Sequence, residues 1–175
     1  MNRFISISGA FALGLAAAPT HAAPAPAALV ADALGAAPAG LAKGATVMTG
    51  DGKVLRKGSN GWTCMPDNPR TPGRDPMCFD KAGLAWAMAW MGHKPLPAGP
   101  IGMAYMLKGG SDASNLDPYA KGPKGGWVTT GPHVMLLSAE AAKASGLPAG
   151  AHPDTSKPYV MFAGTPYAHI MMPVR

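Results

Sequence analysis

Glycine and proline interrupt this chain so often that no regular secondary-structure element has room to be long. The 175 residues include 23 Gly and 19 Pro, a share just under the range typical of disordered low-complexity chains. The hydrophobic fraction of 47% is nevertheless ordinary for a globular protein. The chain is therefore predicted to fold as a loop-rich globular protein. Coiled coils, repeat arrays and multi-pass membrane proteins are excluded, because the sequence has no sustained heptads, no fixed-period repeats and only one long apolar run.

The N-terminus is predicted to be a secretory signal peptide over residues 1–22. Arg3 supplies the positive start, an uncharged apolar stretch follows over 4–18, and Ala22 ends a small-residue cleavage site. Residues 23–42 are almost all Ala, Pro, Gly, Leu and Val, and are interpreted as a flexible lead-in. Residues 43–175 then form a single globular domain. We expect it to be periplasmic or secreted, with no transmembrane segment after signal removal.

Short apolar segments bounded by glycine or proline indicate the secondary structure. Two segments, 46–49 and 53–56, flank Gly50–Gly52 and predict a hairpin. Helices are predicted over 81–91, capped by Asp80, and over 139–144, capped by Ser138. Buried strands are expected at 101–107, 133–137, 159–162 and 169–172. Strands and helices do not alternate regularly, so the predicted fold class is α+β, with a small, mostly antiparallel sheet, one main helix and long Pro/Gly-rich loops.

The two cysteines, Cys64 and Cys78, are predicted to form a disulfide, because an even cysteine count in an exported chain is typical of disulfide bonding. The alternative is a thiol or metal site, since each cysteine adjoins a methionine, Met65 or Met77. Neither a CxxC redox motif nor a CxxCH haem motif is present.

Two motifs resemble a small family of exported bacterial proteins of unassigned function. The first, GWTCxPDxPxTPGxDPMC, spans residues 61–78, and the second, GGSDASN, spans 109–115. The likeness extends over most of residues 59–175. The resemblance implies an exported single-domain protein and carries no activity with it.

The second motif concentrates hydroxyl and carboxyl groups after a predicted strand. Ser111, Asp112 and Ser114 are the catalytic candidates, with a serine acting as the nucleophile of a hydrolase and a histidine from elsewhere as its base. No GxSxG, SxxK or KTG motif accompanies them. Calcium bound by Asp112, Ser114 and Asp117 is a second alternative, without the EF-hand glycine and glutamate. The third is an Asx/Ser turn in this segment, whose side chains bond to their own backbone.

Two of the predicted strands begin with a histidine followed two residues later by a methionine. His133 precedes Met135, and His169 precedes Met171. Residues two apart on a strand share one face, and imidazole with thioether suits Cu(I). These four residues are therefore the predicted metal ligands, with copper as the metal. The alternating positions are interpreted as the core face; they are Val134, Leu136, Ala168, Ile170 and Met172. The alternative is a buried histidine satisfied by backbone, with methionine as packing.

Three classes of function stay open, and the sequence does not decide whether the protein is an enzyme. The first is an exported cell-envelope protein that binds a soft metal, copper, or a small ligand. The second is a hydrolase using residues 111–115 with a histidine, and the third is a non-catalytic structural or interaction domain. The formal net charge is +6, but the basic residues are spread singly and no nucleic-acid motif is present, so no nucleic-acid partner is expected. Trp86 and Trp90, four apart on the main helix, suit a core or a pocket wall.

Overall fold

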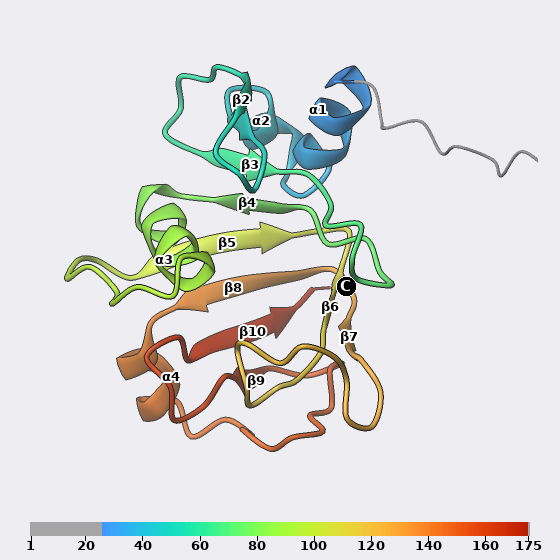
Figure 1. Cartoon of the computed structure of the whole chain (residues 1–175). Coiled ribbons are helices and arrows are strands. Elements are labelled where there is room, and N and C mark those ends of the chain that lie inside the picture. The colour runs from blue at the N-terminus through green and yellow to red at the C-terminus, as the bar shows by residue number, and fades with distance from the viewer. Residues whose placement is uncertain (1–25, 175) are drawn as a thin grey trace, which may run out of the picture.

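The computed structural model describes residues 26–174, so the predicted signal peptide and Ala23 lie outside the described residues. Within this range the chain forms four helices and ten strands (Figure 1). The helices are α1 (Pro26–Leu34), α2 (Ala39–Ala42), α3 (Lys81–Met91) and α4 (Ala139–Ala144). The strands are β1 (Thr46–Met48), β2 (Val54–Arg56), β3 (Thr63–Met65), β4 (Met77–Phe79), β5 (Gly102–Met106), β6 (Gly110–Asp112), β7 (Val128–Thr130), β8 (His133–Leu137), β9 (Tyr159–Met161) and β10 (His169–Pro173).

Eight of these strands form one sheet in the order β2-β1-β3-β4-β5-β8-β10-β9, and β6 pairs with β7 in a separate two-stranded sheet. The β1–β3 pair is parallel and the other strand pairs within residues 26–174 are antiparallel. The longest helix in that range, α3, has 11 residues. The predicted α+β class with a mostly antiparallel sheet and one main helix is confirmed. Among the described residues, no helix has the length and apolar character needed to cross a membrane.

Helix α3 begins as predicted and lies close against the sheet. The side chain of Asp80 caps it, accepting hydrogen bonds from the backbone N–H of Gly83 at 2.6 Å and of Met103 at 3.1 Å. Two glycines face each other at the contact, because a Cβ on Gly102 would lie 2.6 Å from the Cα of Gly83. Their missing side chains allow the helix backbone to approach β5, which places the helix over the sheet.

The largest core lies on the sheet face that carries the histidines and methionines, which corrects the predicted assignment of faces. Strand β8 is buried at His133, Met135 and Leu137 and only half-buried at Val134 and Leu136. The register places further buried residues of β4, β5, β9 and β10 on the same face; they are Phe79, Ala104, Met106, Met161, His169 and Met171. Helix α3 covers this face with Trp86 and Ala87. The prediction took the wholly apolar positions as the core face. It failed because the helix that packs on the sheet, α3, decides which face carries the largest core, rather than side-chain polarity.

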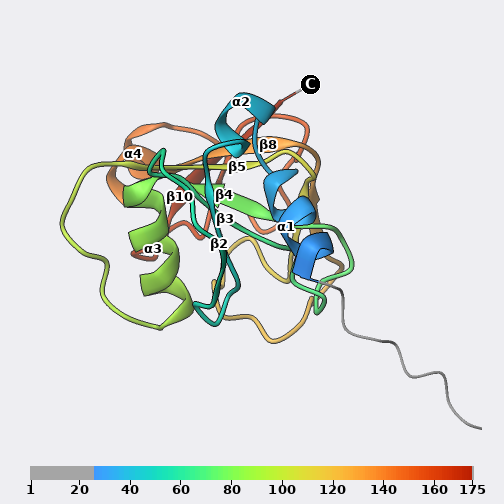
Figure 2. The same cartoon turned by 90° about the horizontal axis from the view of Figure 1, so that it is seen from above.

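The opposite face carries two smaller apolar clusters. Under α4, Ala142 packs with Val160, Ala168 and Ile170, and α3 and α4 lie on opposite sides of the sheet (Figure 2). Near β1 and β3, the N-terminal helices bury Ala33 and Ala36 completely against Val47 and the cysteines. The flexible lead-in predicted for 23–42 is therefore wrong over residues 26–42, because the alanines fit close to the sheet and the prolines flank the helices.

The predicted disulfide is present. Cys64 and Cys78 lie directly opposite each other on β3 and β4, with a Cα–Cα distance of 3.9 Å and an S–S distance of 2.04 Å. Both cysteines are completely buried. The bond closes a loop, residues 66–76, that passes beside the core face described above.

Candidate functional site

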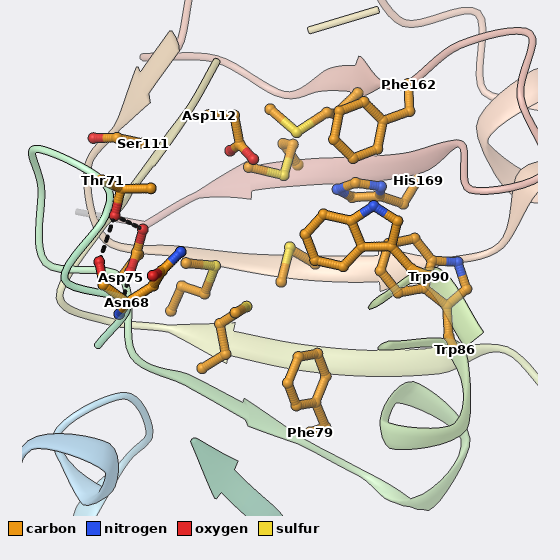
Figure 3. Close-up of a pocket in the computed structure, with 15 residues that line it drawn as sticks. Asn68, Thr71, Asp75, Phe79, Trp86, Trp90, Ser111, Asp112, Phe162 and His169 are labelled. Atoms are coloured by element: carbon orange, nitrogen blue, oxygen red, sulfur yellow. Dashed lines mark hydrogen bonds between the residues drawn. The ribbon is translucent and has the colours of Figure 1, made fainter. Parts of the chain in front are cut away.

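A cavity of about 110 Å³ lies on the histidine–methionine face of the sheet, and we call it the chamber (Figure 3). Its chemistry changes from one end to the other: polar side chains stand at one end, sulfur atoms occupy the middle, and aromatic rings stand with His169 at the other end. The lining residues are Asn68, Thr71, Asp75, Met77, Phe79, Trp86, Trp90, Met106, Ser111, Asp112, Met135, Met161, Phe162, His169 and Met171.

Five methionines line the chamber, and three of them surround His169 through the strand register. Met161 on β9 is the direct partner of His169 on β10. Met171 lies two residues beyond His169 on the same strand and pairs directly with Met135 on β8. Direct partners on one face have Cβ atoms about 5 Å apart, so the register places Met161, Met171 and Met135 beside or diagonal to His169 on one face of the sheet.

His169 is held by one ring nitrogen, which leaves the other free. Its Nδ1 lies 2.9 Å from the carbonyl oxygen of Tyr167. A carbonyl only accepts, so Nδ1 carries the proton and Nε2 keeps its lone pair. Among the described residues, none hydrogen-bonds to that Nε2. Fixing one ring nitrogen on a backbone carbonyl is the usual way in which proteins orient a metal-binding histidine.

Electrostatics keep this imidazole neutral. Burial and the charge on a protonated His133 lower the pKa of His169, the hydrogen bond to the Tyr167 carbonyl opposes them, and the resulting pKa is about 4. The ring also stands edge-on to two aromatic neighbours, with its centroid 5.2 Å from that of Trp86 and 5.4 Å from that of Phe162. At neutral pH the side chain is therefore a lone-pair donor in an apolar, aromatic environment.

His133 occupies a different place from the one predicted for a shared site. It pairs with Pro173, four residues along β10 from His169, which separates the two Cα atoms by about 13 Å along the strands. The chamber lining within residues 26–174 includes His169 and not His133. His133 instead lies toward the polar end: a Cβ added to Gly110 would lie 3.6 Å from its Cε1 and 3.7 Å from the Cβ of Asp75.

The His133 ring is buried, and one of its two nitrogens is hydrogen-bonded. Its Nδ1 lies 2.7 Å from the carbonyl oxygen of Gly131, while its Nε2 is buried without a hydrogen-bond partner among the described residues. Burial lowers the pKa of His133, and the hydrogen bond that its ring donates to the Gly131 carbonyl opposes that change. The alternative of a core histidine satisfied by backbone thus accounts for one nitrogen of each ring and leaves the other open.

The polar end of the chamber is built by the disulfide-closed loop. The carboxyl of Asp75 accepts hydrogen bonds from the backbone N–H of Asn68 at 3.0 Å and the hydroxyl of Thr71 at 2.5 Å. The backbone N–H of Asp75 donates to the Asp67 side chain at 2.8 Å. Helix α1 secures the loop from outside, because Asp32 accepts from the backbone N–H of Asp67 at 2.8 Å and pairs with Arg74.

A second carboxyl, Asp112 on β6, faces the chamber without any such support. Figure 3 shows its oxygens directed toward the sulfur atoms, whereas the Ser111 hydroxyl points the other way. No described residue donates a hydrogen bond to this carboxyl. Burial, together with the negative charge of Asp75, raises the pKa of Asp112 to about 7. Burial also raises the pKa of Asp75. Within residues 26–174, the chamber lining thus holds two carboxyls and no lysine or arginine, and burial favours the protonated form of both carboxyls.

The predicted catalytic loop does not assemble a nucleophile and base within the described residues. Ser111 lines the chamber, but both imidazoles bond to backbone and neither hydrogen-bonds to it. Ser114 accepts from the backbone N–H groups of Leu116 and Asp117, each at 3.0 Å. Asn115 donates to the carbonyls of Gly150 and Val160. The local bonds of Ser114 agree with the turn alternative, whereas Asn115 bonds to backbone carbonyls of distant segments.

Several lining residues were not predicted from the sequence. Met77, Met106 and Met161 come from strands whose neighbours are set by long-range pairing, and Asp75 comes from the proline-rich loop. One signal was available: each of the strands β4, β5, β8, β9 and β10 carries a methionine. Only the strand register shows that one from each lies on a single face.

The groups of the chamber that could donate a lone pair to a metal ion are mainly thioether sulfurs and one imidazole. The described residues contain no group of three or more His, Cys, Asp or Glu side chains placed to hold a metal ion together. Zinc and calcium sites are built from such groups. The ligands that do gather are thioether sulfurs around one imidazole, which suit a soft, monovalent ion.

Comparisons with known proteins found no matching family model, no similar curated protein and no similar solved structure. The family resemblance of the two motifs therefore stays a prediction.

Proposed function

We propose that this chain is an exported cell-envelope protein that binds Cu(I) in the chamber, through His169, Met135, Met161 and Met171. The supporting observation is the register that gathers three thioethers around one buried imidazole with a free Nε2. In this proposed site Met161 is the fourth ligand, a role for which the sequence had suggested His133. Soft thioether ligands together with imidazole favour Cu(I) over harder divalent ions.

The size of the chamber favours an ion over an organic ligand. A dry protein cavity that admits benzene has a volume of about 150 Å³, whereas the chamber measures about 110 Å³. A cation in the chamber also needs an opposite charge near it, because burying an isolated charge is costly. Asp112 and Asp75 supply that opposite charge from the other end of the same cavity.

Two adjacent methionines of β10 provide a matched test. Met171 faces the chamber and Met172 faces away, half-buried on the other side of the sheet. Replacing methionine by leucine removes the sulfur and nearly keeps the volume, at a stability cost usually below about 1.5 kcal/mol. We expect Met171→Leu to weaken Cu(I) binding at least tenfold and Met172→Leu to leave it unchanged. Anaerobic competition against a coloured Cu(I) chelator measures both.

X-ray absorption on the copper-loaded protein gives a second readout. The proposal requires sulfur scatterers together with one nitrogen, and loss of the nitrogen in His169→Phe. Equal affinities of the Met171→Leu and Met172→Leu variants would contradict the proposal and would leave the methionines as packing. Turnover of ester substrates that depends on Ser111 would instead favour the hydrolase. Absence of both binding and turnover would favour the structural or interaction domain.

The export part of the proposal has its own measurement. Processing of the predicted signal peptide gives a mature chain that begins at Ala23. Intact-mass spectrometry of protein recovered from the cell envelope is expected to show this N-terminus, and a chain that still begins at Met1 would overturn the prediction.

A further inference from the structure

A second pocket adjoins the chamber along its polar end and two of its aromatic residues, and we call it the outer pocket. Its volume is about 330 Å³. It faces solvent, because the exposed side chains Arg70, Asp117 and Lys121 line it. The outer pocket and the chamber share six lining residues, which are Asn68, Thr71, Trp90, Ser111, Asp112 and Phe162. Only this ring of side chains separates the buried thioethers from solvent on that side.

Most polar side chains of the ring are already occupied by the protein. The Thr71 hydroxyl donates to Asp75, the Asn68 side-chain oxygen accepts from Arg70, and the Trp90 indole N–H donates to the carbonyl of Pro118 at 3.2 Å. Asp112 differs from these, because its carboxyl receives no hydrogen bond from the described residues and points toward the sulfur atoms (Figure 3). It is also the charged member of the ring.

We propose that the outer pocket is the entrance to the chamber and that Asp112 is a transit ligand, the first protein group to bind an entering Cu(I) ion. This inference rests on the proposed function. The carboxylate attracts the cation and replaces one solvent ligand. The softer thioethers then displace the carboxylate, since Cu(I) prefers sulfur to oxygen. No electron is transferred: copper remains Cu(I), and solvent molecules are the leaving ligands.

The surrounding charges make Asp112 the residue on which attraction depends. Arg70 and Lys121 lie on exposed loops of the outer pocket and repel a free cation. Asp117, also exposed, uses its carboxyl to accept from the backbone N–H of Tyr119 at 2.9 Å. Asp75 stands behind Asp112 and reinforces its negative potential. A charge placed at a narrow access changes association rates more than equilibrium affinities.

Stopped-flow mixing of the metal-free protein with the cationic Cu(I)–acetonitrile complex tests the inference, with the fluorescence of Trp86 and Trp90 as the readout. Asp112→Asn keeps the shape of the side chain and removes its charge, and Asp117→Asn is the matched control in the same pocket. At pH 8 we expect Asp112→Asn to slow association about tenfold, in the range of electrostatic effects on rates. Its equilibrium affinity should stay within about threefold of wild type, and Asp117→Asn should match wild type in both.

A second measurement uses salt, which screens charges that are exposed to solvent. Raising the ionic strength should change the association rate of wild type more than that of Asp112→Asn. The inference is overturned if Asp112→Asn binds at the wild-type rate, if Asp117→Asn slows association equally, or if affinity falls as much as rate. Each of these results leaves the proposed function standing, whereas failure of the wild-type protein to bind Cu(I) ends both.

Discussion

His133 and His169 make the same local hydrogen bond and yet end in different surroundings. Each directs Nδ1 to the carbonyl two residues before it, Gly131 or Tyr167. His169 has Met161 as its direct cross-strand partner, whereas His133 lies beside Gly110 and Asp75. A His-x-Met pattern can therefore predict which nitrogen stays free, but the strand register decides what that nitrogen faces.

Asp112 is expected to give the protein a characteristic pH dependence of stability. Its folded-state pKa of about 7 exceeds the ordinary value of 3.8, so the folded state binds the proton more tightly than the unfolded state does. Its favourable contribution is fully present below the unfolded pKa and is lost as pH rises toward 7 and beyond. Asp112→Asn has no such loss.

Urea unfolding of wild type and Asp112→Asn at pH 5 and pH 8 measures this effect. The stability advantage of the variant should be greater at pH 8 by about 2 kcal/mol, a value reduced from the full shift because the side chain is only half-buried. An advantage that is the same at both pH values would show that Asp112 is well solvated or has a compensating partner.

At the scale of elements, helix α1 acts as the outer support of the chamber's polar wall. Asp32 bonds to the backbone of Asp67 and to the side chain of Arg74, and it is 12% exposed. Because hydrogen bonds to charged groups contribute about 1.5–3 kcal/mol, Asp32→Ala should lower the free energy of unfolding by about 2 kcal/mol and speed amide exchange in residues 66–76. The control is Asp154→Ala, whose pair with Lys157 is exposed and should contribute less than about 1 kcal/mol. Equal effects of the two variants would contradict the support role.

Elements specified by local chemistry could be predicted from the sequence, and those specified by pairing could not. Asp80 and Ser138 cap α3 and α4 at the predicted positions, and glycines make the turn between β1 and β2. Strands β3, β4, β6 and β7 have three residues each, too few for a hydrophobic period to show. The same limit applies to the chamber. Strand spacing pointed to His169, Met135 and Met171. The place of Met161 and of Asp112 in the chamber depends on the order of the strands in the sheet, which the spacing does not show.

At the scale of the whole molecule, the disulfide is expected to contribute a large part of the stability. A loop of this length gives about 3 kcal/mol in the chain-entropy model, and the four prolines within it reduce the gain. Replacing both cysteines by alanine should lower the free energy of unfolding by about 2–3 kcal/mol in urea titration. Thiol labelling of the denatured, unreduced wild type should give no signal. Two reactive thiols, or an unchanged urea midpoint in the variant, would contradict this prediction.

The placement of that bond also links two processes that are usually separate. Residues 66–76, which form the polar wall of the chamber, lie between the two joined cysteines, and Asp75 is only three residues from Cys78. In a newly made chain whose cysteines are still reduced, residues 66–76 lack the covalent bond that joins their two ends. We therefore expect oxidation to act as a maturation step for the cavity, so that the joining of the two sulfurs precedes a firm form of the proposed binding site.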